Sequence, residues 1–226
     1  MHRTLTFLAA LALAGAAGAA SPQDSTTEGP YDLLFRQGTL DDVAQDRTLV
    51  YTREVTNAAD PEAAAGETGL VALSFSEGER DTMANLQFRQ EGKHRNLGSF
   101  PASVGNPMIM VFYETVIRDM AEATGGSAFY IRNRVKEALV EPAEISQGEA
   151  RFEGGEVPVT RVVMHPFADD AERARMGPFA DLELSVVMSD EVPGWYLSLT
   201  ANAPDASGGD GGYVTDMRFD TLEPAR

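Results

Sequence analysis

Two groups of segments with a period of two, separated by one stretch with a helical period, constrain the fold of this chain most strongly. Side chains of a strand alternate between its two faces, so a period of two indicates strands. The first group comprises residues 48–56, 70–76, 82–90 and 93–100, joined by short polar segments. Such spacing is typical of hairpins, so we predict an antiparallel meander of four strands here.

The stretch that follows predicts two helices. Asn106-Pro107 places a capping side chain and a first-turn proline in the order that helix starts favour. Gly125-Gly126 would end the first helix, Ser127 could cap the second, and Glu141-Pro142 would end the second. One apolar face of the second helix recurs at helical spacing, in Ile131, Val135, Ala138 and Leu139.

The second group of segments returns to a period of two, over residues 157–164, 180–189, 195–202 and 213–219. Strands grouped apart from helices are typical of α+β proteins with an antiparallel sheet. We therefore predict an α+β fold with a curved antiparallel sheet, a half-barrel of seven or eight strands. The two central helices would pack on its concave face.

The first residues have the features of a secretory signal peptide. His2 and Arg3 precede an apolar run over residues 5–13, and small residues follow up to Ala20. The run is too short to span about 30 Å of hydrocarbon, and no cysteine follows it for lipid attachment. We predict a signal peptide over residues 1–20 with cleavage near Ala20, a disordered leader over 21–30 and one α+β domain over 31–226. We expect the mature protein to be periplasmic or secreted.

Charge and composition limit the possible partners. The chain has 35 acidic and 18 basic residues, a net charge of −17. Such a surface repels nucleic acid and anionic membranes. No later segment approaches the roughly 18 apolar residues of a membrane span, so we expect no stable membrane insertion of the mature chain. Because the chain has no cysteine, packing alone must stabilise it.

The residues needed for common catalytic sites are scarce. The chain lacks the G-x-S-x-G and phosphate-loop motifs, and after the signal peptide its only histidines are His94 and His165. These two are not at i, i+3 or i, i+4, so a zinc site is not expected. Adjacent carboxylates such as Asp169 and Asp170 suit a solvated turn. The sequence favours a non-catalytic protein without a cofactor over an enzyme. A hydrolase that uses His165 is the third of three hypotheses, and the other two are given below.

Six consecutive apolar residues, from Met108 to Tyr113, open the first predicted helix. An ordinary surface helix keeps one polar face, so this segment is either buried on all sides or faces a cavity or a partner. Methionine adapts to irregular apolar ligands. The first hypothesis is an exported binding or carrier module for an apolar or lipid-like ligand. Its candidate ligand-binding residues are Met108, Met110, Phe112, Tyr113 and Trp195.

The second predicted helix carries a group of basic residues on a strongly acidic chain. Arg132, Arg134 and Lys136 lie away from its apolar face. A basic patch of this kind could meet an acidic surface of another protein. The second hypothesis is therefore an envelope assembly or protein-interaction factor, in which these three residues bind the partner.

The order of elements resembles that of the periplasmic lipoprotein carriers LolA and LolB. An N-terminal helical segment within 31–43 is followed by a meander, two helices and a second meander. The resemblance implies an incomplete barrel closed by helices over a hydrophobic cavity that receives acyl chains. It covers most of the chain as an order of elements and includes no diagnostic motif, so no functional residue is carried over.

Overall fold

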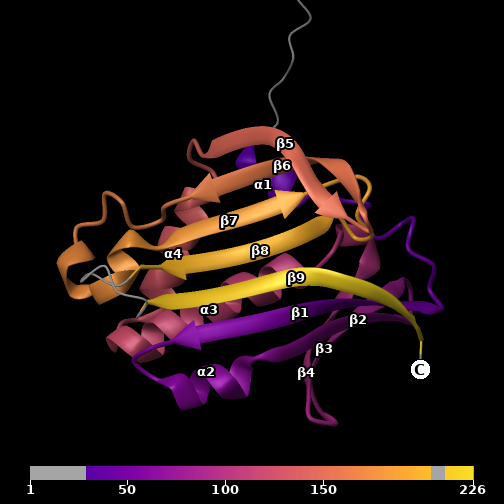
Figure 1. Ribbon diagram of the computed structural model, residues 1–226, viewed down its shortest axis with the longest axis horizontal. Helices are drawn as coiled ribbons and strands as arrows, with labels where there is room; N and C mark the ends of the chain where they lie inside the picture. Colours follow the sequence, from indigo (N-terminus) through magenta and orange to yellow (C-terminus); the bar gives the residue numbers. More distant parts are fainter. Residues whose placement is uncertain (1–28, 205–211, 226) are drawn as a thin grey trace, which may run out of the picture.

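The computed structural model describes residues 29–204 and 212–225. The predicted signal peptide and most of the predicted leader lie outside these residues. Nine strands form one antiparallel sheet in the order β4-β3-β2-β1-β9-β8-β7-β6-β5 (Figure 1). The strands are β1 (Arg47–Asn57), β2 (Gly69–Glu77), β3 (Thr82–Gln90), β4 (Lys93–Pro101), β5 (Glu144–Phe152), β6 (Gly155–Met164), β7 (Glu183–Met188), β8 (Tyr196–Ala203) and β9 (Tyr213–Pro224).

The α+β class and the antiparallel sheet are confirmed, but the predicted count of seven or eight strands is wrong. The additional strand is β5, which lies at one edge of the sheet and pairs with β6. Nearly all of its side chains are exposed, so its sequence shows no alternation between apolar and polar residues. Glu153 and Gly154, both with positive φ, connect it to β6 in a tight hairpin.

The sheet curves and does not close on itself. Its described edges are β4 and β5, which lie at opposite ends of the strand order. Register shifts interrupt the pairing at Val50/Tyr51, Leu86/Gln87 and Val187/Met188. An extra residue in one strand of a pair bends that strand and increases its twist, so these shifts contribute to the curvature.

The two central helices form as predicted. They are α3 (Met108–Thr124) and α4 (Ala128–Ala138). Gly125 ends α3 in the left-handed conformation with φ of 66°, and the Ser127 side chain accepts a hydrogen bond from the amide of Tyr130. Both helices lie behind the sheet in Figure 1.

Shorter helices complete the fold. The N-terminal helix α1 (Pro30–Leu34) begins one residue before the predicted segment 31–43 and covers only its first residues. The segment that joins β1 to β2 contains α2 (Pro61–Glu67), which Asp60 caps by accepting a hydrogen bond from the amide of Ala63. The 3₁₀ helices are η1 (Ala102–Val104), η2 (Arg173–Arg175) and η3 (Gly177–Asp181).

The core lies between the sheet and α3. On β3, Ala84, Leu86 and Phe88 are buried, as their alternation predicts. On α3, the side chains buried against them and the other strands include Met108, Ile109 and Phe112. This continuous cluster of buried apolar residues stabilises a chain that has no disulfide.

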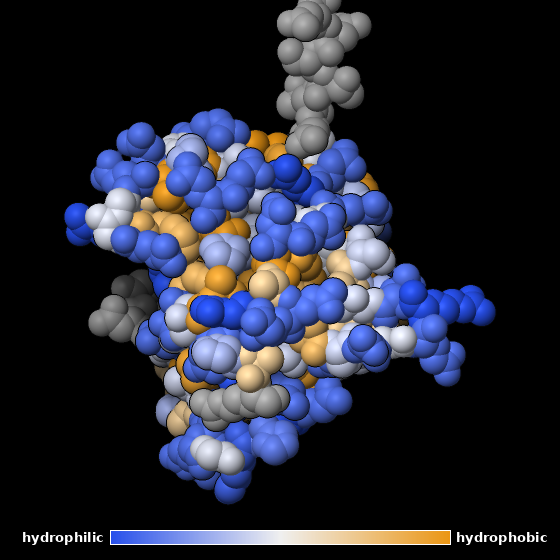
Figure 2. Space-filling model, turned by 90° about the vertical axis from the view of Figure 1, so that its right-hand side faces the viewer, coloured by the Kyte–Doolittle hydropathy of each residue, from blue (hydrophilic) through white to orange (hydrophobic). Residues whose placement is uncertain are grey.

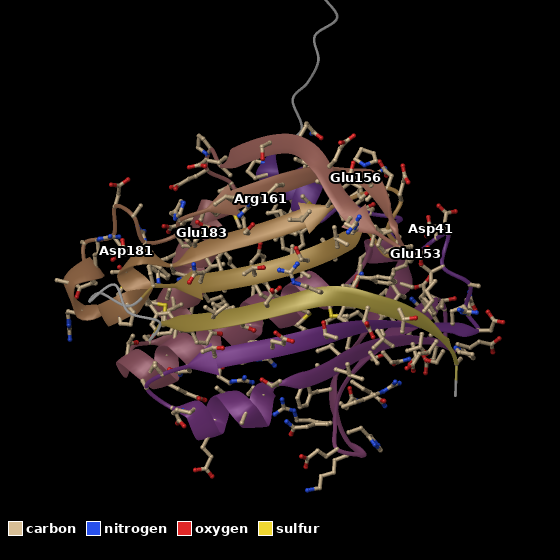
Figure 3. All side chains as sticks on the ribbon, in the orientation of Figure 1. Asp41, Glu153, Glu156, Arg161, Asp181 and Glu183 are labelled. Carbon is tan, nitrogen blue, oxygen red and sulfur yellow. The ribbon has the colours of Figure 1, made fainter. Side chains whose placement is uncertain are left out.

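Polar and charged side chains cover much of the outer surface. Figure 2 shows one end of the molecule, where hydrophilic residues predominate and hydrophobic ones appear between them. Asp41, Glu153 and Glu156 lie at this end (Figure 3). On the face of the sheet away from the helices, Arg161 of β6 lies 3.5 Å from the Glu183 carboxylate of β7 (Figure 3).

Candidate functional site

An apolar groove of about 870 Å³ lies between α1, β4, α3 and α4. Ligand pockets in proteins commonly have volumes of about 300–1,000 Å³ and mostly apolar walls. Its lining residues are Tyr31, Phe35, Leu97, Phe100, Met110, Val111, Tyr113, Glu114, Thr115, Ile117, Arg118, Arg132, Val135, Lys136, Leu139 and Val140.

The apolar start of α3 serves both the core and this groove. Met108, Ile109 and Phe112 are at most 1 % exposed and pack in the core. Met110 and Val111, in the same two turns, are only partly buried and line the groove. The six-residue apolar run is therefore not buried on all sides: one side of the helix packs in the core and another side faces the groove.

Hydrogen bonds from the hairpin that joins β7 to β8 hold α1 against the groove. The Trp195 indole donates to the carbonyl oxygen of Leu33 over 3.0 Å. The Tyr196 hydroxyl donates to the carbonyl oxygen of Leu34 over 2.6 Å. With its backbone fixed in this way, α1 and its C-terminal end present Tyr31 and Phe35, whose rings stack with centroids 4.9 Å apart.

The five predicted ligand-binding residues do not all meet at one site. Met110 and Tyr113 line the groove, and the Tyr113 ring lies 6.5 Å from that of Phe35. Met108 and Phe112 lie in the core. Trp195 borders a different, more polar hollow, where the Arg36 guanidinium lies 4.5 Å from its ring centroid.

Sequence reasoning missed most of the groove wall. The remaining apolar side chains are Val111 and Ile117 from α3, Tyr31 and Phe35 from α1 and its C-terminal end, Leu97 and Phe100 from β4, and Val135, Leu139 and Val140 from α4 and its C-terminal end. Tyr31 and Val140 are 50 % and 73 % exposed. Large apolar side chains this exposed, gathered around a concave surface, are the signal of a binding site. That signal exists only once the chain is folded.

Charged residues line one part of the groove. Arg132 of α4 binds the Glu114 carboxylate of α3 with both arms, Nε to Oε1 at 2.8 Å and Nη2 to Oε2 at 2.7 Å. This hydrogen bond, with the charges of Arg132 and Lys136, holds the pKa of Glu114 below its ordinary value. Lys136 itself makes no ion pair within 4 Å among the described residues.

The third basic residue predicted to bind a partner, Arg134, turns away from the groove. It forms ion pairs with Glu137 and with Asp170, whose Oδ2 lies 2.8 Å from its Nε. Asp170 is buried, unlike the exposed Asp169, so the expectation that both carboxylates are solvated is wrong for Asp170. Tyr130 also donates to Asp170, over 2.8 Å, which fastens the loop after β6 onto α4.

A second charged cluster lies beside the C-terminal half of α3. The buried guanidinium of Arg53 lies 2.8 Å from Glu67, and Arg95 and Arg118 approach the same carboxylate at 3.3 and 3.4 Å. Tyr213 donates to Asp119 over 2.8 Å. This cluster joins β1, α2, β4 and α3. Every charge in it has an opposite charge nearby, so we assign it a structural role.

The structure brings no catalytic partner to either predicted histidine. His94 and His165 are both exposed, and neither takes part in a side-chain hydrogen bond or ion pair with the described residues. In the same parts of the chain, no three His, Asp or Glu side chains are placed to hold a metal ion. No described helix combines the length and apolarity needed to cross a membrane.

Comparisons with known proteins give a structural likeness but no sequence match. No family model matches the chain, and no curated protein sequence matches it. The crystal structure of the Mycobacterium tuberculosis lipoprotein LppX is similar with a TM-score of 0.36 and 11 % sequence identity. The alignment covers 87 % of this chain and 97 % of that one. The function is therefore argued from the groove itself.

Proposed function

We propose that this protein is an exported, non-catalytic carrier that binds the apolar chain of a lipid-like ligand in the groove. The observation that carries the proposal is the convergence of apolar side chains from α1, β4, α3 and α4 on one hollow of about 870 Å³. Leaving such surface in water is unfavourable by about 25 cal/mol per Å², and a bound alkyl chain removes it from water.

The composition of the groove wall favours a chain-like ligand. Tyr31 and Phe35 supply flat rings, whereas Met110, Leu139 and Val140 supply aliphatic surface. Such a wall offers many dispersion contacts and few hydrogen-bond partners. This composition suits an alkyl or acyl chain better than a polar metabolite.

Two matched pairs of substitutions test the site. Tyr31 and Val104 are both 50 % exposed, and Val140 and Phe129 are 73 % and 70 % exposed, but only Tyr31 and Val140 line the groove. Tyr31→Asp and Val140→Asp should weaken binding of the neutral dye Nile red about tenfold or more, because the dye would desolvate a carboxylate. Val104→Asp and Phe129→Asp remove similar exposed surface elsewhere and should leave binding unchanged.

Native mass spectrometry of the protein purified from its own envelope provides the second measurement. The spectrum of the wild type should show a bound lipid that is released on activation. The Val140→Asp variant should carry less of this lipid. If the wild type binds neither Nile red nor a co-purifying lipid, the carrier proposal is wrong. Equal loss in all four variants would place the site elsewhere.

Export is tested separately. We expect the mature protein to begin near Ser21 and to fractionate with periplasmic or secreted proteins. N-terminal sequencing of that fraction decides the point, because an unprocessed chain in the cytoplasm would contradict it.

The protein-interaction hypothesis receives less support. Two of its three basic residues are engaged within the chain, Arg132 with Glu114 and Arg134 with Glu137 and Asp170. A partner would have to replace these ion pairs, so little net attraction would remain.

A further inference from the structure

The charges that line the groove are opposite in balance to those of the whole chain. Acidic residues outnumber basic ones by 35 to 18 in the sequence. In the groove the basic side chains are Arg118, Arg132 and Lys136, and the acidic lining residue is Glu114. Arg118 is paired with Asp119 and Glu67, and Arg132 is paired with Glu114, so the basic excess in the groove is Lys136. A hollow with a basic excess in a strongly acidic protein concentrates anions locally, because nearby charges dominate over distant, screened ones.

Three of these charges lie close together. The Arg132–Glu114 ion pair joins α4 to the middle of the groove-lining part of α3. The charge of Lys136 also acts on the Glu114 carboxylate. Along α3, apolar Met110 and Val111 precede Glu114, and apolar Ile117 follows it.

On α4 and its C-terminal end, apolar Val135 lies between Arg132 and Lys136, and apolar Leu139 and Val140 follow. Apolar residues thus flank the charged ones on both helices. The charged side chains form one patch in a wall that is otherwise mostly apolar.

The geometry points to an amphiphile with an anionic headgroup as the ligand: its chain lies along the apolar wall and its anion at Lys136 and Arg132. This inference rests on the proposed function and names the ligand class of the same groove. Lys136 is the stronger candidate contact, because its ammonium group is exposed and makes no ion pair within 4 Å among the described residues. Arg132 has further N–H groups beyond the two that bind Glu114.

Two headgroups share this chemistry, the carboxylate of a fatty acid and the phosphate of a phospholipid. Displacement of Nile red by dodecanoate, dodecyl phosphate and dodecanol separates them, since the three compounds share one chain and differ only at its end. At low ionic strength we expect one or both anions to bind about 3–10-fold more tightly than dodecanol. The advantage should shrink as salt is added.

Two substitutions should change this preference in opposite directions. Lys136→Gln removes the free cation and should weaken binding of the anions several-fold. Glu114→Gln removes the carboxylate that competes with the ligand for Arg132, so it should strengthen binding of the anions. Dodecanol should bind all variants equally. Lys93→Gln, an exposed lysine on β4 outside the groove, is the control and should change nothing.

The outcomes separate this inference from the proposed function. A preference for one of the two anions supports the inference and identifies the headgroup. Equal binding of all three compounds, with no effect of Lys136→Gln, overturns the inference but leaves the groove as a binding site for apolar chains. If no compound displaces the dye, the proposed function is wrong as well.

Discussion

The side-chain amide of Asn106 donates a hydrogen bond to the carbonyl oxygen of Gly194 over 2.8 Å, across 88 positions of sequence. Its carbonyl oxygen accepts from the amide of Met108 over 3.0 Å, at the start of α3. One buried side chain thus fastens the groove-lining helix to the hairpin that also holds α1.

Replacing this side chain should destabilise the whole fold. Asn106→Ala leaves a buried amide and a buried carbonyl without partners, at a cost of about 2 kcal/mol in the free energy of unfolding. Urea denaturation measures the loss. Asn133→Ala, a half-buried amide on α4, is the control and should cost much less. Equal stability of Asn106→Ala and the wild type would show that these bonds contribute little.

Gly194 itself allows a close approach that no other residue permits. It has φ of 76°, and an added Cβ would lie 2.4 Å from Cδ2 of Leu49 and 2.9 Å from Nδ2 of Asn106. Gly194→Ala should therefore combine backbone strain of about 1 kcal/mol with overpacking of about 1–3 kcal/mol.

Gly125 separates these two effects. Its φ is 66°, but an added Cβ would meet no atom within 4 Å. Gly125→Ala should cost only the backbone strain, about 1 kcal/mol. Thermal unfolding of both variants checks the difference, and equal losses would mean that the approach to Leu49 is relieved by small movements.

Local signals in the sequence account for most of the strands and for both central helices, and the unpredicted strand β5 shows where such signals fail. Glu91-Gly92 predicts the turn between β3 and β4, and the same dipeptide, Glu153-Gly154, connects β5 to β6. Before Glu153-Gly154, however, the sequence shows no alternation of apolar and polar residues, so it does not predict a strand there. An edge strand with little burial needs no apolar face, so hydrophobic periodicity cannot reveal it.

The groove could be predicted only in part, for a related reason. Met110 and Tyr113 belong to an apolar run that is unusual by itself. Leu97, Phe100 and Val140 are ordinary apolar residues in their own segments, and their convergence depends on how β4 and α4 lie in the fold. Periodicity indicates which side chains avoid water, but not whether a core or an open groove receives them.

Glu67 should make stability depend on pH. Burial raises the pKa of this carboxyl, but the charges of Arg53, Arg118 and Arg95 outweigh burial and leave it below the ordinary value of 4.5. A lowered native pKa stabilises the fold above pH 4.5, and this contribution is lost as pH falls through the native pKa. Glu67→Gln should cost about 3 kcal/mol at pH 7, because the buried Arg53 loses the nearer of its two carboxylate partners and keeps only Asp119 at 3.9 Å.

Acid titration of the unfolding free energy isolates this effect. The difference between Glu67→Gln and the wild type should narrow below pH 4.5, where the wild-type carboxylate also becomes neutral. Glu62→Gln, an exposed position on the same helix, is the control. If the difference in unfolding free energy between the two proteins stays constant from pH 7 to 3, it does not depend on the charge of Glu67. That result would contradict a stabilising role for this charge.

Tyr113 has a buried hydroxyl group with no hydrogen-bond partner among the described residues. Tyr113→Phe removes this polar group and keeps the ring at the groove, so we expect stability to rise by up to about 1 kcal/mol with Nile red binding unchanged. Tyr196→Phe is the matched comparison, because the hydroxyl of Tyr196 has a hydrogen-bond partner and that of Tyr113 has none among the described residues. Its hydroxyl donates to the carbonyl oxygen of Leu34, so its loss should cost about 1–2 kcal/mol and loosen α1.

Alkaline pH gives a second test of the Tyr113 environment. Burial raises the pKa of this phenol above its ordinary value of 10.0. The unfolded chain therefore ionises Tyr113 at lower pH than the folded chain does, so stability is lost as pH rises beyond 10. Tyr113→Phe should lose less stability than the wild type over this range. Parallel loss in both proteins would mean that the hydroxyl reaches water, and its burial would then not explain any gain at neutral pH.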